Sequence, residues 1–219
     1  MNVVITGGNR GIGLALVSAL LARNYNVYVT CRNSSDALNS TNATVISGVD
    51  VSKPESLEKA LQPLKDVPID WLINNAGVLG NESIRDWEPA TIDYQFRVNA
   101  LGPLLVTQIL LSNLSEGGKI GLMTSRMGSM TDNGSGGYYG YRMSKAALNA
   151  AGVSLAHDLK AKGIAVALLH PGFVQTEMVN NAGDITPEQA ASGLVQRLDE
   201  LTLETTGQFF HSNGDVLPW

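Results

Sequence analysis

Short apolar runs alternate along the chain with longer segments that mix apolar and polar residues. The apolar runs predict seven strands, at residues 2–6, 26–31, 44–47, 69–73, 118–124, 165–170 and 208–210. The mixed segments predict five helices, at residues 11–23, 54–64, 91–114, 138–162 and 187–201. Strands that are apolar throughout are typical of a buried parallel sheet, and right-handed crossovers place helices on both of its faces. The pattern therefore predicts an α/β fold with a doubly wound parallel sheet of about seven strands.

The whole chain is expected to form a single domain, residues 1–219. Its 219 residues, 44% of them hydrophobic, suffice for one sizeable core. The glycine- and serine-rich stretch 128–137 is a loop rather than a domain boundary, because the alternation of strands and helices resumes directly after it.

The charge balance argues against a nucleic-acid partner. The chain has 15 basic and 20 acidic residues, a net charge of −5, and no basic run. The longest apolar region, residues 101–114, is interrupted by Gly102, Pro103, Thr107 and Gln108 and is too short to span a bilayer. We therefore expect a small-molecule partner, with neither nucleic acid nor membrane involved.

The cysteine and histidine residues narrow the chemistry further. Cys31 is the single cysteine, so no internal disulfide can form, which fits a reducing compartment and a cytoplasmic protein. His157, His170 and His211 show no metal-ligand spacing, so no catalytic metal is expected.

A glycine-rich turn follows the first predicted strand. Residues 6–13 are Thr-Gly-Gly-Asn-Arg-Gly-Ile-Gly, and this Gly-x-x-x-Gly-x-Gly spacing is longer than the Gly-x-Gly-x-x-Gly of many dinucleotide folds. Glycines let a ligand approach the main chain, and the N-terminus of the following helix suits a phosphate. The alternative is an ordinary strand–helix connection. Because the turn lies between the first strand and the first helix, we favour a Rossmann-like dinucleotide site.

The end of the second predicted strand indicates which dinucleotide is bound. A site for the plain ribose usually has Asp or Glu there, but this strand ends in Val-Thr-Cys-Arg, with Arg32 last. Arg10 lies in the glycine-rich turn as well, and two guanidinium groups suit a 2′-phosphate. The alternative is a pair of solvated surface arginines. We predict that NADP(H) is preferred, and NAD(H) stays a second option.

Tyr141 and Lys145 lie four residues apart in a segment of good helix formers. One helical turn places both side chains on one face, where the ammonium group is expected to lower the pKa of the phenol. Such a phenol would donate and accept protons nearer neutral pH. Alone, the pair is more often a packed aromatic ring beside a solvated amine than a catalytic pair.

Six motifs follow one another in a fixed order along the chain. They are Thr6-Gly-x-x-x-Gly-x-Gly13, Asn74-Asn75-Ala76-Gly77, Asn99, Ser125, Tyr141-x-x-x-Lys145 and Pro171-Gly172. The ordered set resembles the compact form of the short-chain dehydrogenase/reductase family over almost the full length. Within that family, residues 134–149 and the ending 217–219 are similar to sniffer-type carbonyl reductases and bacterial C-factor proteins.

The resemblance implies a role for each of four residues. Tyr141 would protonate the alkoxide that forms when a carbonyl is reduced, and Lys145 would hold the nicotinamide ribose and lower the pKa of Tyr141. Ser125 would orient the substrate oxygen, and Asn99 would steady a water that links Lys145 to solvent. As a strand-end hydroxyl and a helix amide, Ser125 and Asn99 also have purely structural interpretations. The implied activity is NADPH-dependent reduction of small or medium-sized aldehydes and ketones.

The resemblance also implies a set of coenzyme contacts. Asp50 is expected at the adenine amine, Val174 and Thr176 at the nicotinamide amide and pyrophosphate, and Asn75 and its neighbours beside the coenzyme. The full expected set is Gly7, Asn9, Arg10, Gly11, Ile12, Gly13, Arg32, Asp50, Val51, Asn75, Ala76, Gly77, Tyr141, Lys145, Pro171, Gly172, Val174 and Thr176.

Two departures from the family bear on the substrate. The segment 177–186 is short for a substrate lid, while Ser125 and Tyr141 are sixteen positions apart, more than is common in the family. Met127, Met130 and Met178 are expected near the pocket, where flexible thioethers adapt to varied apolar shapes, although such methionines are usually only packing residues.

Partners and alternative functions follow from the same resemblance. Apolar residues on more than one face of the helices at 91–114 and 138–162, among them Leu104, Leu105, Ile109 and Leu155, predict a homodimer, with a tetramer as a second option. A dinucleotide-binding sensor of the C-factor type, with little or no turnover, is the alternative function. A sugar-nucleotide epimerase is disfavoured because its larger substrate domain has no counterpart here.

Overall fold

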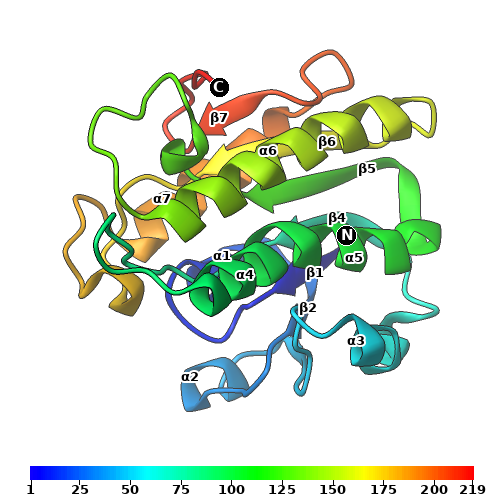
Figure 1. The fold of residues 1–219 in the computed structure, drawn as a ribbon. Helices are drawn as coiled ribbons and strands as arrows, with labels where there is room; N and C mark the ends of the chain where they lie inside the picture. Colours follow the sequence, from blue (N-terminus) through cyan, green and yellow to red (C-terminus); the bar gives the residue numbers. More distant parts are fainter.

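The computed structural model describes residues 1–219 and contains one seven-stranded sheet. The strand order is β3-β2-β1-β4-β5-β6-β7, and every neighbouring pair is parallel (Figure 1). The strands are β1 (Asn2–Thr6), β2 (Asn26–Thr30), β3 (Thr44–Ile46), β4 (Ile69–Asn74), β5 (Leu114–Met123), β6 (Ala165–His170) and β7 (Phe209–His211). The predicted doubly wound α/β fold is confirmed.

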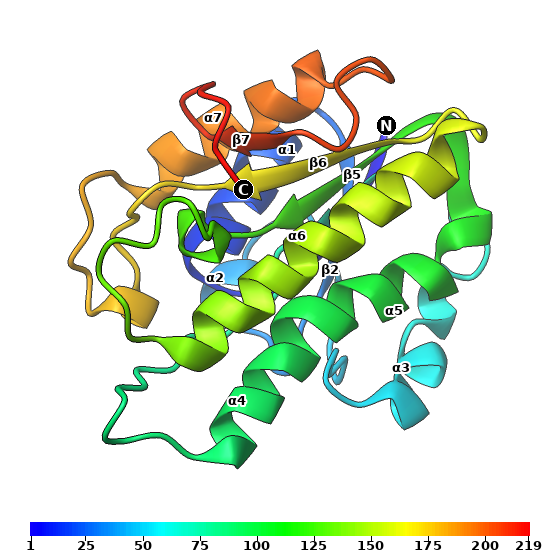
Figure 2. The same cartoon turned by 45° about the horizontal axis from the view of Figure 1, so that its top comes forward.

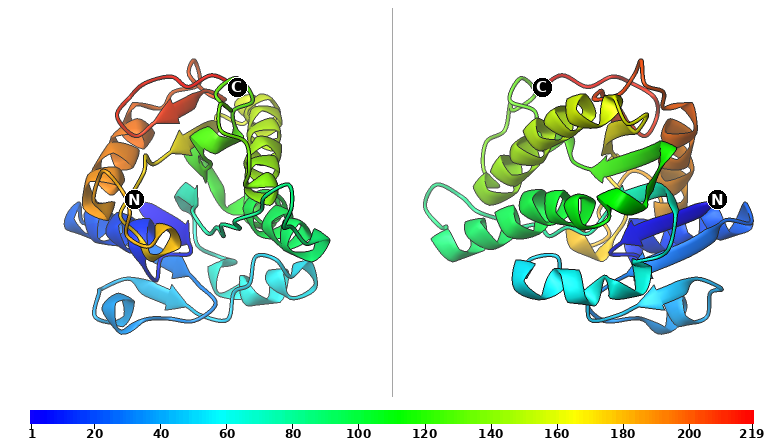
Figure 3. Two further views of the ribbon diagram at one scale, coloured as in Figure 1. Left: turned by 60° about the vertical axis from the view of Figure 1, so that its left-hand side comes forward. Right: turned by 90° about the vertical axis from the view of Figure 1, so that its right-hand side faces the viewer.

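Helices cover both faces of the sheet. The α-helices are α1 (Gly11–Ala22), α2 (Asp36–Asn39), α3 (Pro54–Ala60), α4 (Pro89–Phe96), α5 (Gly102–Ile109), α6 (Tyr139–Lys160) and α7 (Pro187–Glu200). α1 and α7 pack on one face, whereas α4, α5 and α6 lie in a row across the other (Figures 2 and 3). None of the helices combines the length and apolar character that a membrane span needs.

The alternation of side chains along β1 explains the two-sided core. Val3 and Ile5 belong to one buried cluster with residues of α1 and α7, and Val4 belongs to another with residues of α5 and α6. Successive side chains of a strand point to opposite faces, so an entirely apolar strand needs a helical layer on each side.

The chain reverses its direction across the sheet between β1 and β4. From β1 it runs outward through β2 and β3, and it then returns to the other side of β1 to form β4. In open parallel sheets, ligands bind at the carboxyl ends of the strands beside such a reversal. The loops that follow β1 and β4 meet at this point.

The helix predicted at residues 91–114 is the largest local error of the sequence analysis. It begins earlier, at Pro89, and a π-helical turn (η2, Arg97–Leu101) separates α4 from α5, which ends at Ile109. Pro103 has no N–H group to donate to the carbonyl of Asn99, so the regular α-helical ladder cannot continue through this point.

Other element boundaries differ by smaller amounts. β5 begins at Leu114 instead of residue 118, because Leu114 pairs with Ile69 before the register shifts. β7 starts one residue later than predicted, and the short helix α2 between β2 and β3 was not predicted. Ser35 caps α2 by accepting a hydrogen bond from the Leu38 N–H.

The starts of α7 and α6 contrast. α7 carries its own capping box, in which Thr186 and Gln189 bond each other's backbone. α6 follows Tyr138, which has a left-handed backbone (φ 52°) and makes no side-chain cap. The first turn of α6 therefore depends on another part of the chain.

Candidate active site

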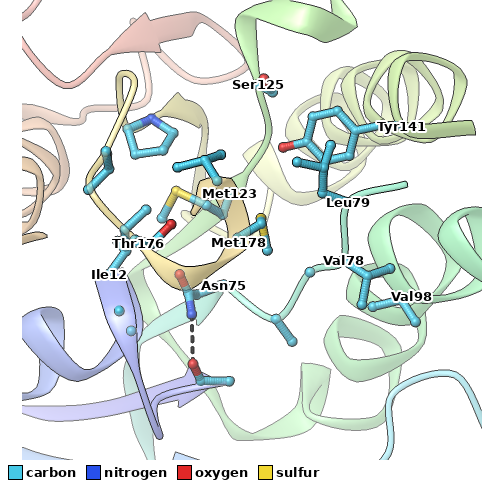
Figure 4. A pocket seen from close by; sticks show the side chains of 18 of the residues that line it. Ile12, Asn75, Val78, Leu79, Val98, Met123, Ser125, Tyr141, Thr176 and Met178 are labelled. Atoms are coloured by element: carbon cyan, nitrogen blue, oxygen red, sulfur yellow. Dashed lines mark hydrogen bonds between the residues drawn. The ribbon is translucent and has the colours of Figure 1, made fainter. Parts of the chain in front are cut away.

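A cavity of about 1060 Å³ opens at the carboxyl ends of the central strands. Its walls include the loops after β1, β2, β3, β4, β5 and β6 together with the start of α6 (Figure 4). Every residue named above as a coenzyme contact lines this cavity, as do Ser125, Tyr141 and Lys145. Among the predicted site residues, Asn99 alone is not part of the wall.

Two glycines of the loop after β1 are required by close packing. A Cβ atom on Gly7, which has φ +70°, would lie 2.8 Å from the Cα of Ala76. A Cβ atom on Gly13 would lie 2.2 Å from the carbonyl oxygen of Gly7. The loop thus folds tightly against α1 and the loop after β4, and it presents its main chain to the cavity.

Asn75 ties this loop to the end of β4. Its side-chain amide donates to the carbonyl oxygens of Thr6 and Gly7, at 3.1 and 2.9 Å. The Thr6 hydroxyl in turn accepts hydrogen bonds from the backbone N–H groups of Asn75 and Ala76, both at 3.0 Å. These bonds hold the two sides of the crevice at a fixed separation.

The N-terminus of α1 is available to an anion. Its N-cap residue, Arg10, makes no side-chain cap, and no acidic residue lies in its first turn. Gly11 lies directly beside Thr176, since a Cβ atom there would lie 3.3 Å from the Thr176 methyl group. Unpaired N–H groups and the positive end of the helix suit a pyrophosphate at this position.

The two arginines predicted to bind a 2′-phosphate differ in their surroundings. Arg10 forms an exposed ion pair with Glu177 of the loop after β6, with Nη1 and Oε2 2.5 Å apart. Arg32 donates from Nη1 to the neutral hydroxyl of Tyr94 at 3.0 Å. Arg10 is therefore held in an ion pair, whereas Arg32 is in none.

Asp50 and Val51 form the wall beside Arg32. Burial raises the pKa of Asp50, but hydrogen bonds from the Ser52 hydroxyl and N–H and the charge of Arg32 outweigh it, so the pKa lies below its ordinary value. The carboxylate therefore stays ionised and can accept a hydrogen bond from an amine.

Tyr141 directs its hydroxyl into the cavity, with Ser125 at the same end (Figure 4). Lys145 is buried, its Nζ lies 5.6 Å from the Tyr141 ring centroid, and it donates to the Met123 carbonyl at 2.7 Å. One helical turn does bring the two side chains together, as the spacing predicted.

The pKa values of this pair differ from the sequence prediction. Burial raises the pKa of Tyr141, and the hydrogen bond with Ser125 only partly offsets that rise. Burial also lowers the pKa of Lys145 to about 7, so near neutral pH the side chain is divided between its charged and its neutral form. The prediction that Lys145 lowers the pKa of Tyr141 is therefore wrong for the chain without its coenzyme. Loss of contact with water is the largest cause of both pKa shifts.

Ser125 lies directly after β5. It is buried at the cavity wall, and its hydroxyl oxygen accepts a hydrogen bond from the Met127 N–H at 3.1 Å. This bond leaves the hydroxyl proton available as a donor.

Asn99 is fully buried in η2, behind the cavity wall. Its side-chain amide exchanges two hydrogen bonds of 2.8 Å with the backbone of Val78 and donates to the Ser144 hydroxyl at 3.0 Å. The side chain thus holds the loop after β4 against α6. Its backbone carbonyl, by contrast, has no α-helical donor, because residue 103 is proline.

The segment after β6 closes the cavity opposite the glycine-rich loop. Pro171 and Val174 are buried, Gly172 has φ +97°, and Val174 pairs with Ile185 in a single β-bridge. That bridge folds the predicted short lid back on itself.

Several wall residues were not identified from the sequence. Four of them are apolar, namely Val78, Leu79, Val98 and Met123, and four are polar, namely Arg126, Asp132, Arg142 and His170. Leu79 lies beside Tyr141 (Figure 4). Met127 and Met178 line the cavity as expected, but Met130 does not and is 73% exposed. Some of these residues lie at or after the end of a strand, whereas Val98 lies in η2 and Arg142 in α6. Neither position in the sequence reveals the direction of a side chain.

Comparison with known proteins agrees with this geometry. The family model for short chain dehydrogenases matches residues 1–186. The chain is 40% identical over 223 residues, 99% of each protein, to 1-hydroxy-2-glutathionyl-2-methyl-3-butene dehydrogenase of Rhodococcus sp. (strain AD45). It is 43% identical over 155 residues, 69% of this chain and 93% of the relative, to the C-signal protein of Myxococcus xanthus.

Solved structures show the same fold. The Drosophila melanogaster carbonyl reductase Sniffer superposes with a TM-score of 0.91 at 29% identity, covering 100% of this chain and 99% of the other. The NADPH-bound carbonyl reductase from chicken fatty liver gives a TM-score of 0.90 at 29% identity, with 100% and 98% covered. The predicted similarity to sniffer-type and C-factor proteins is confirmed, and the chain belongs to the short-chain dehydrogenase/reductase family.

Proposed function

We propose that this protein is an NADPH-dependent oxidoreductase that reduces the carbonyl group of small or medium-sized aldehydes and ketones to alcohols. The single domain 1–219 is the catalytic unit. One observation carries the proposal: Tyr141, Ser125 and Lys145 line the same cavity as an anion-accepting glycine-rich loop. A proton donor, a second hydroxyl and a coenzyme cradle in one cavity suit hydride transfer to a carbonyl.

In this mechanism the coenzyme supplies the hydride, and the chain supplies position and protonation. Ser125 donates a hydrogen bond to the carbonyl oxygen and orients it towards Tyr141. Tyr141 then transfers its phenolic proton to the developing alkoxide. Its raised pKa keeps it protonated beforehand, as a general acid must be.

Lys145 holds the nicotinamide ribose and returns a proton to Tyr141. A pKa of about 7 lets its ammonium group release and regain a proton near neutral pH. We propose that a water held by the Asn99 backbone carbonyl links Lys145 to solvent. Asn99 and Lys145 flank Gly77, where an added Cβ atom would lie 3.3 Å from Asn99 Oδ1 and 3.7 Å from Lys145 Nζ.

The activity is tested by following NADPH absorbance with a panel of aldehydes, ketones and diketones. The panel includes a carbonyl compound that carries a glutathionyl group, because the Rhodococcus relative is named as the dehydrogenase of an alcohol that carries this group. We expect turnover of at least one compound, and loss of turnover in Tyr141→Phe. Tight NADPH binding without turnover of any compound would contradict the proposal.

The preference for NADP(H) rests on Arg32. No carboxylate lies at the end of β2 to repel a 2′-phosphate, and Arg32 is bonded only to the neutral Tyr94 hydroxyl. In kcat/KM with both coenzymes, Arg32→Asp is expected to reverse the preference, while Arg85→Asp, in an exposed loop, leaves it unchanged. Equal use of NADH and NADPH by the native chain would contradict this preference.

A sensor without turnover is a second candidate function. The 43% identity to the C-signal protein favours it, because that relative is named for signalling. A sensor needs coenzyme binding but no proton donor. It would be supported if Tyr141→Phe retained full biological effect and full coenzyme affinity.

We propose a homodimer and a cytoplasmic location. Apolar side chains are exposed on neighbouring helices of one face, namely Tyr94, Phe96, Leu104 and Met143 on α4, α5 and α6. Sedimentation at micromolar concentration tests the dimer, and a single 23.2 kDa species would remove it. The location rests on Cys31, a free and buried thiol that suits a reducing compartment.

A further inference from the structure

The helix that carries Tyr141 and Lys145 is capped by a residue from another part of the chain. α6 starts after Tyr138, whose left-handed backbone and aromatic side chain provide no cap. Instead, Glu82 of the loop after β4 accepts hydrogen bonds at this helix start. Its carboxylate Oε2 accepts from the Gly140 N–H at 3.2 Å, and its backbone carbonyl accepts from the Tyr138 N–H at 2.7 Å. Gly140 immediately precedes Tyr141.

Gln95 of α4 completes this arrangement. Its Nε2 donates to the other oxygen of the Glu82 carboxylate and to the carbonyl of Thr91, the latter at 3.3 Å. Its Oε1 accepts from the Gly80 N–H at 2.7 Å. Glu82 and Gln95 therefore join three elements: α4, the loop after β4 and the first turn of α6. We call these two residues the Glu82–Gln95 clamp.

The clamp is buried and tightly enclosed. Glu82 is 6% exposed and Gln95 is 2% exposed. A Cβ atom on Gly80 would lie 2.2 Å from Glu82 Oε1, and one on Gly140 would lie 2.3 Å from Gln95 Nε2. The missing Cβ atoms of both glycines leave room for these two side chains, and any larger residue at either position would collide with them.

The Glu82 carboxylate is stabilised without a cation. No ion pair of the structure includes Glu82, and its carboxylate accepts hydrogen bonds from the Gly140 N–H and the Gln95 amide. The positive end of a 22-residue helix favours a negative charge at this place. A buried carboxylate with neutral donors on both oxygens has a defined geometry, because each oxygen has one set partner.

We propose that Glu82 and Gln95 are positioning residues for Tyr141. They fix the first turn of α6 relative to the loop that brings Val78 and Leu79 into the cavity wall. The Tyr141 phenol then keeps a fixed position relative to the part of the cavity wall that Val78 and Leu79 form. The proposal rests on the proposed function, because it assigns the clamp to the step in which Tyr141 protonates the alkoxide.

A hydrogen-bond swap tests the clamp. In Glu82→Gln, the new amide nitrogen replaces one acceptor oxygen. It then faces one of the two existing donors, the Gly140 N–H or Gln95 Nε2, and that hydrogen bond is lost. In Gln95→Glu, two buried carboxylates face each other. The double variant Glu82→Gln/Gln95→Glu restores one carboxylate, one amide and an acceptor for each of Gly80 and Gly140. The matched control is Glu88→Gln, because Glu88 lies in the same loop but is exposed and makes no side-chain cap.

For each single variant we expect kcat at saturating substrates to fall about 10–100-fold, the range typical of a misplaced catalytic group. The Kd for NADPH should stay within about two-fold, because neither residue lines the cavity. The double variant should recover most of kcat, and the control should match the native chain. An unchanged kcat in Glu82→Gln, a double variant no better than the singles, or a Kd that weakens in step with kcat would overturn the proposal.

Hydrogen exchange separates this proposal from the proposed function. The amides of Tyr138 and Gly140 should exchange faster in the single variants, return to the native rate in the double variant, and not change in the control. If the native chain reduces no carbonyl compound, the proposed function fails, and the exchange rates still decide whether the clamp holds the start of α6. Unchanged exchange in Glu82→Gln would overturn the clamp even if the enzyme is active.

Discussion

The two sides of the cavity expose different parts of the chain, backbone on one side and side chains on the other. The coenzyme side, formed by the glycine-rich loop and the N-terminus of α1, presents backbone and depends on missing side chains, as at Gly7 and Gly13. The catalytic side, at the ends of β5 and α6, presents side chains whose protonation burial has altered, as at Tyr141 and Lys145. One side binds through shape and N–H groups, whereas the other acts through proton affinity.

This difference predicts that substitutions on the two sides affect different measurements. A change on the coenzyme side should alter Kd for NADPH, because that is what the backbone cradle supplies. On the catalytic side, a change to Tyr141 should lower kcat with little effect on Kd, and a change to Lys145 should alter the pH dependence of stability. The experiments below test that separation.

The largest expected effect is that of Tyr141→Phe. Loss of the phenolic proton should lower kcat about 10²–10⁴-fold, the usual contribution of a general acid. The Kd for NADPH should stay within about two-fold, measured by quenching of tryptophan fluorescence. Tyr139→Phe is the matched control, since Tyr139 is on the same helix turn but 37% exposed and outside the cavity wall. A large change in Kd with Tyr141→Phe would contradict the separation between a side that binds the coenzyme and a side that acts on kcat.

The pH dependence of stability should separate Lys145→Met from the native chain. In the folded protein Lys145 loses its proton near pH 7, whereas in the unfolded chain it does so near 10.5. Between these values the unfolded state binds more protons, so this group makes stability rise with pH. The rise should total about 3 kcal/mol between pH 7 and pH 10 and should be absent in the variant.

Urea unfolding of both proteins across this pH range provides the measurement. The difference between the two curves isolates Lys145, because every other titrating group is shared. Curves that run parallel from pH 7 to pH 10 would show that Lys145 keeps an ordinary pKa. The proton exchange proposed for it near neutral pH would then have no basis.

On the coenzyme side, Gly13→Ala should weaken NADPH binding about 10–100-fold. The added Cβ atom meets the Gly7 carbonyl at 2.2 Å, and that atom is backbone, so the loop itself must shift. The control is Gly134→Ala, where a Cβ atom meets nothing within 4 Å. Isothermal titration with NADPH measures both variants. Native affinity in Gly13→Ala would mean that the cradle tolerates a displaced loop.

The same contrast explains what the sequence could predict. The glycine spacing, the strand–helix order and Tyr141 with Lys145 are local patterns, and the structure brings all of them to one cavity. The roles of Glu82 and Gln95 depend on residues far apart in the chain, such as Gly140, so no local pattern reveals them. The π-helical turn was missed because Pro103 lies in a stretch that is otherwise typical of a helix.

The pKa prediction failed for a related reason. Spacing alone shows that Lys145 can approach Tyr141, and it implies that the cation favours the phenolate. It does not show that both groups are withdrawn from water, which opposes charge on each of them. Burial is a property of the assembled layers, and only the structure supplies it.

The smallest expected effect concerns the ion pair between Arg10 and Glu177. It joins the glycine-rich loop to the segment after β6, and both side chains are largely exposed, at 63% and 72%. An exposed pair of this kind adds little to stability. Its position matters more, because Glu177 places a negative charge at the wall of a cavity that we expect to take phosphates.

Glu177→Gln should therefore tighten NADPH binding, by up to about five-fold at low ionic strength, because Arg10 is released and a repelling charge is removed. The gain should shrink as salt is added, since both groups are exposed to solvent. Glu58→Gln on α3 removes the same net charge from an exposed site outside the cavity, and it should leave the Kd unchanged. Weaker binding in Glu177→Gln would show instead that the ion pair holds the cavity in its binding shape. The coenzyme side would then depend on side chains after all.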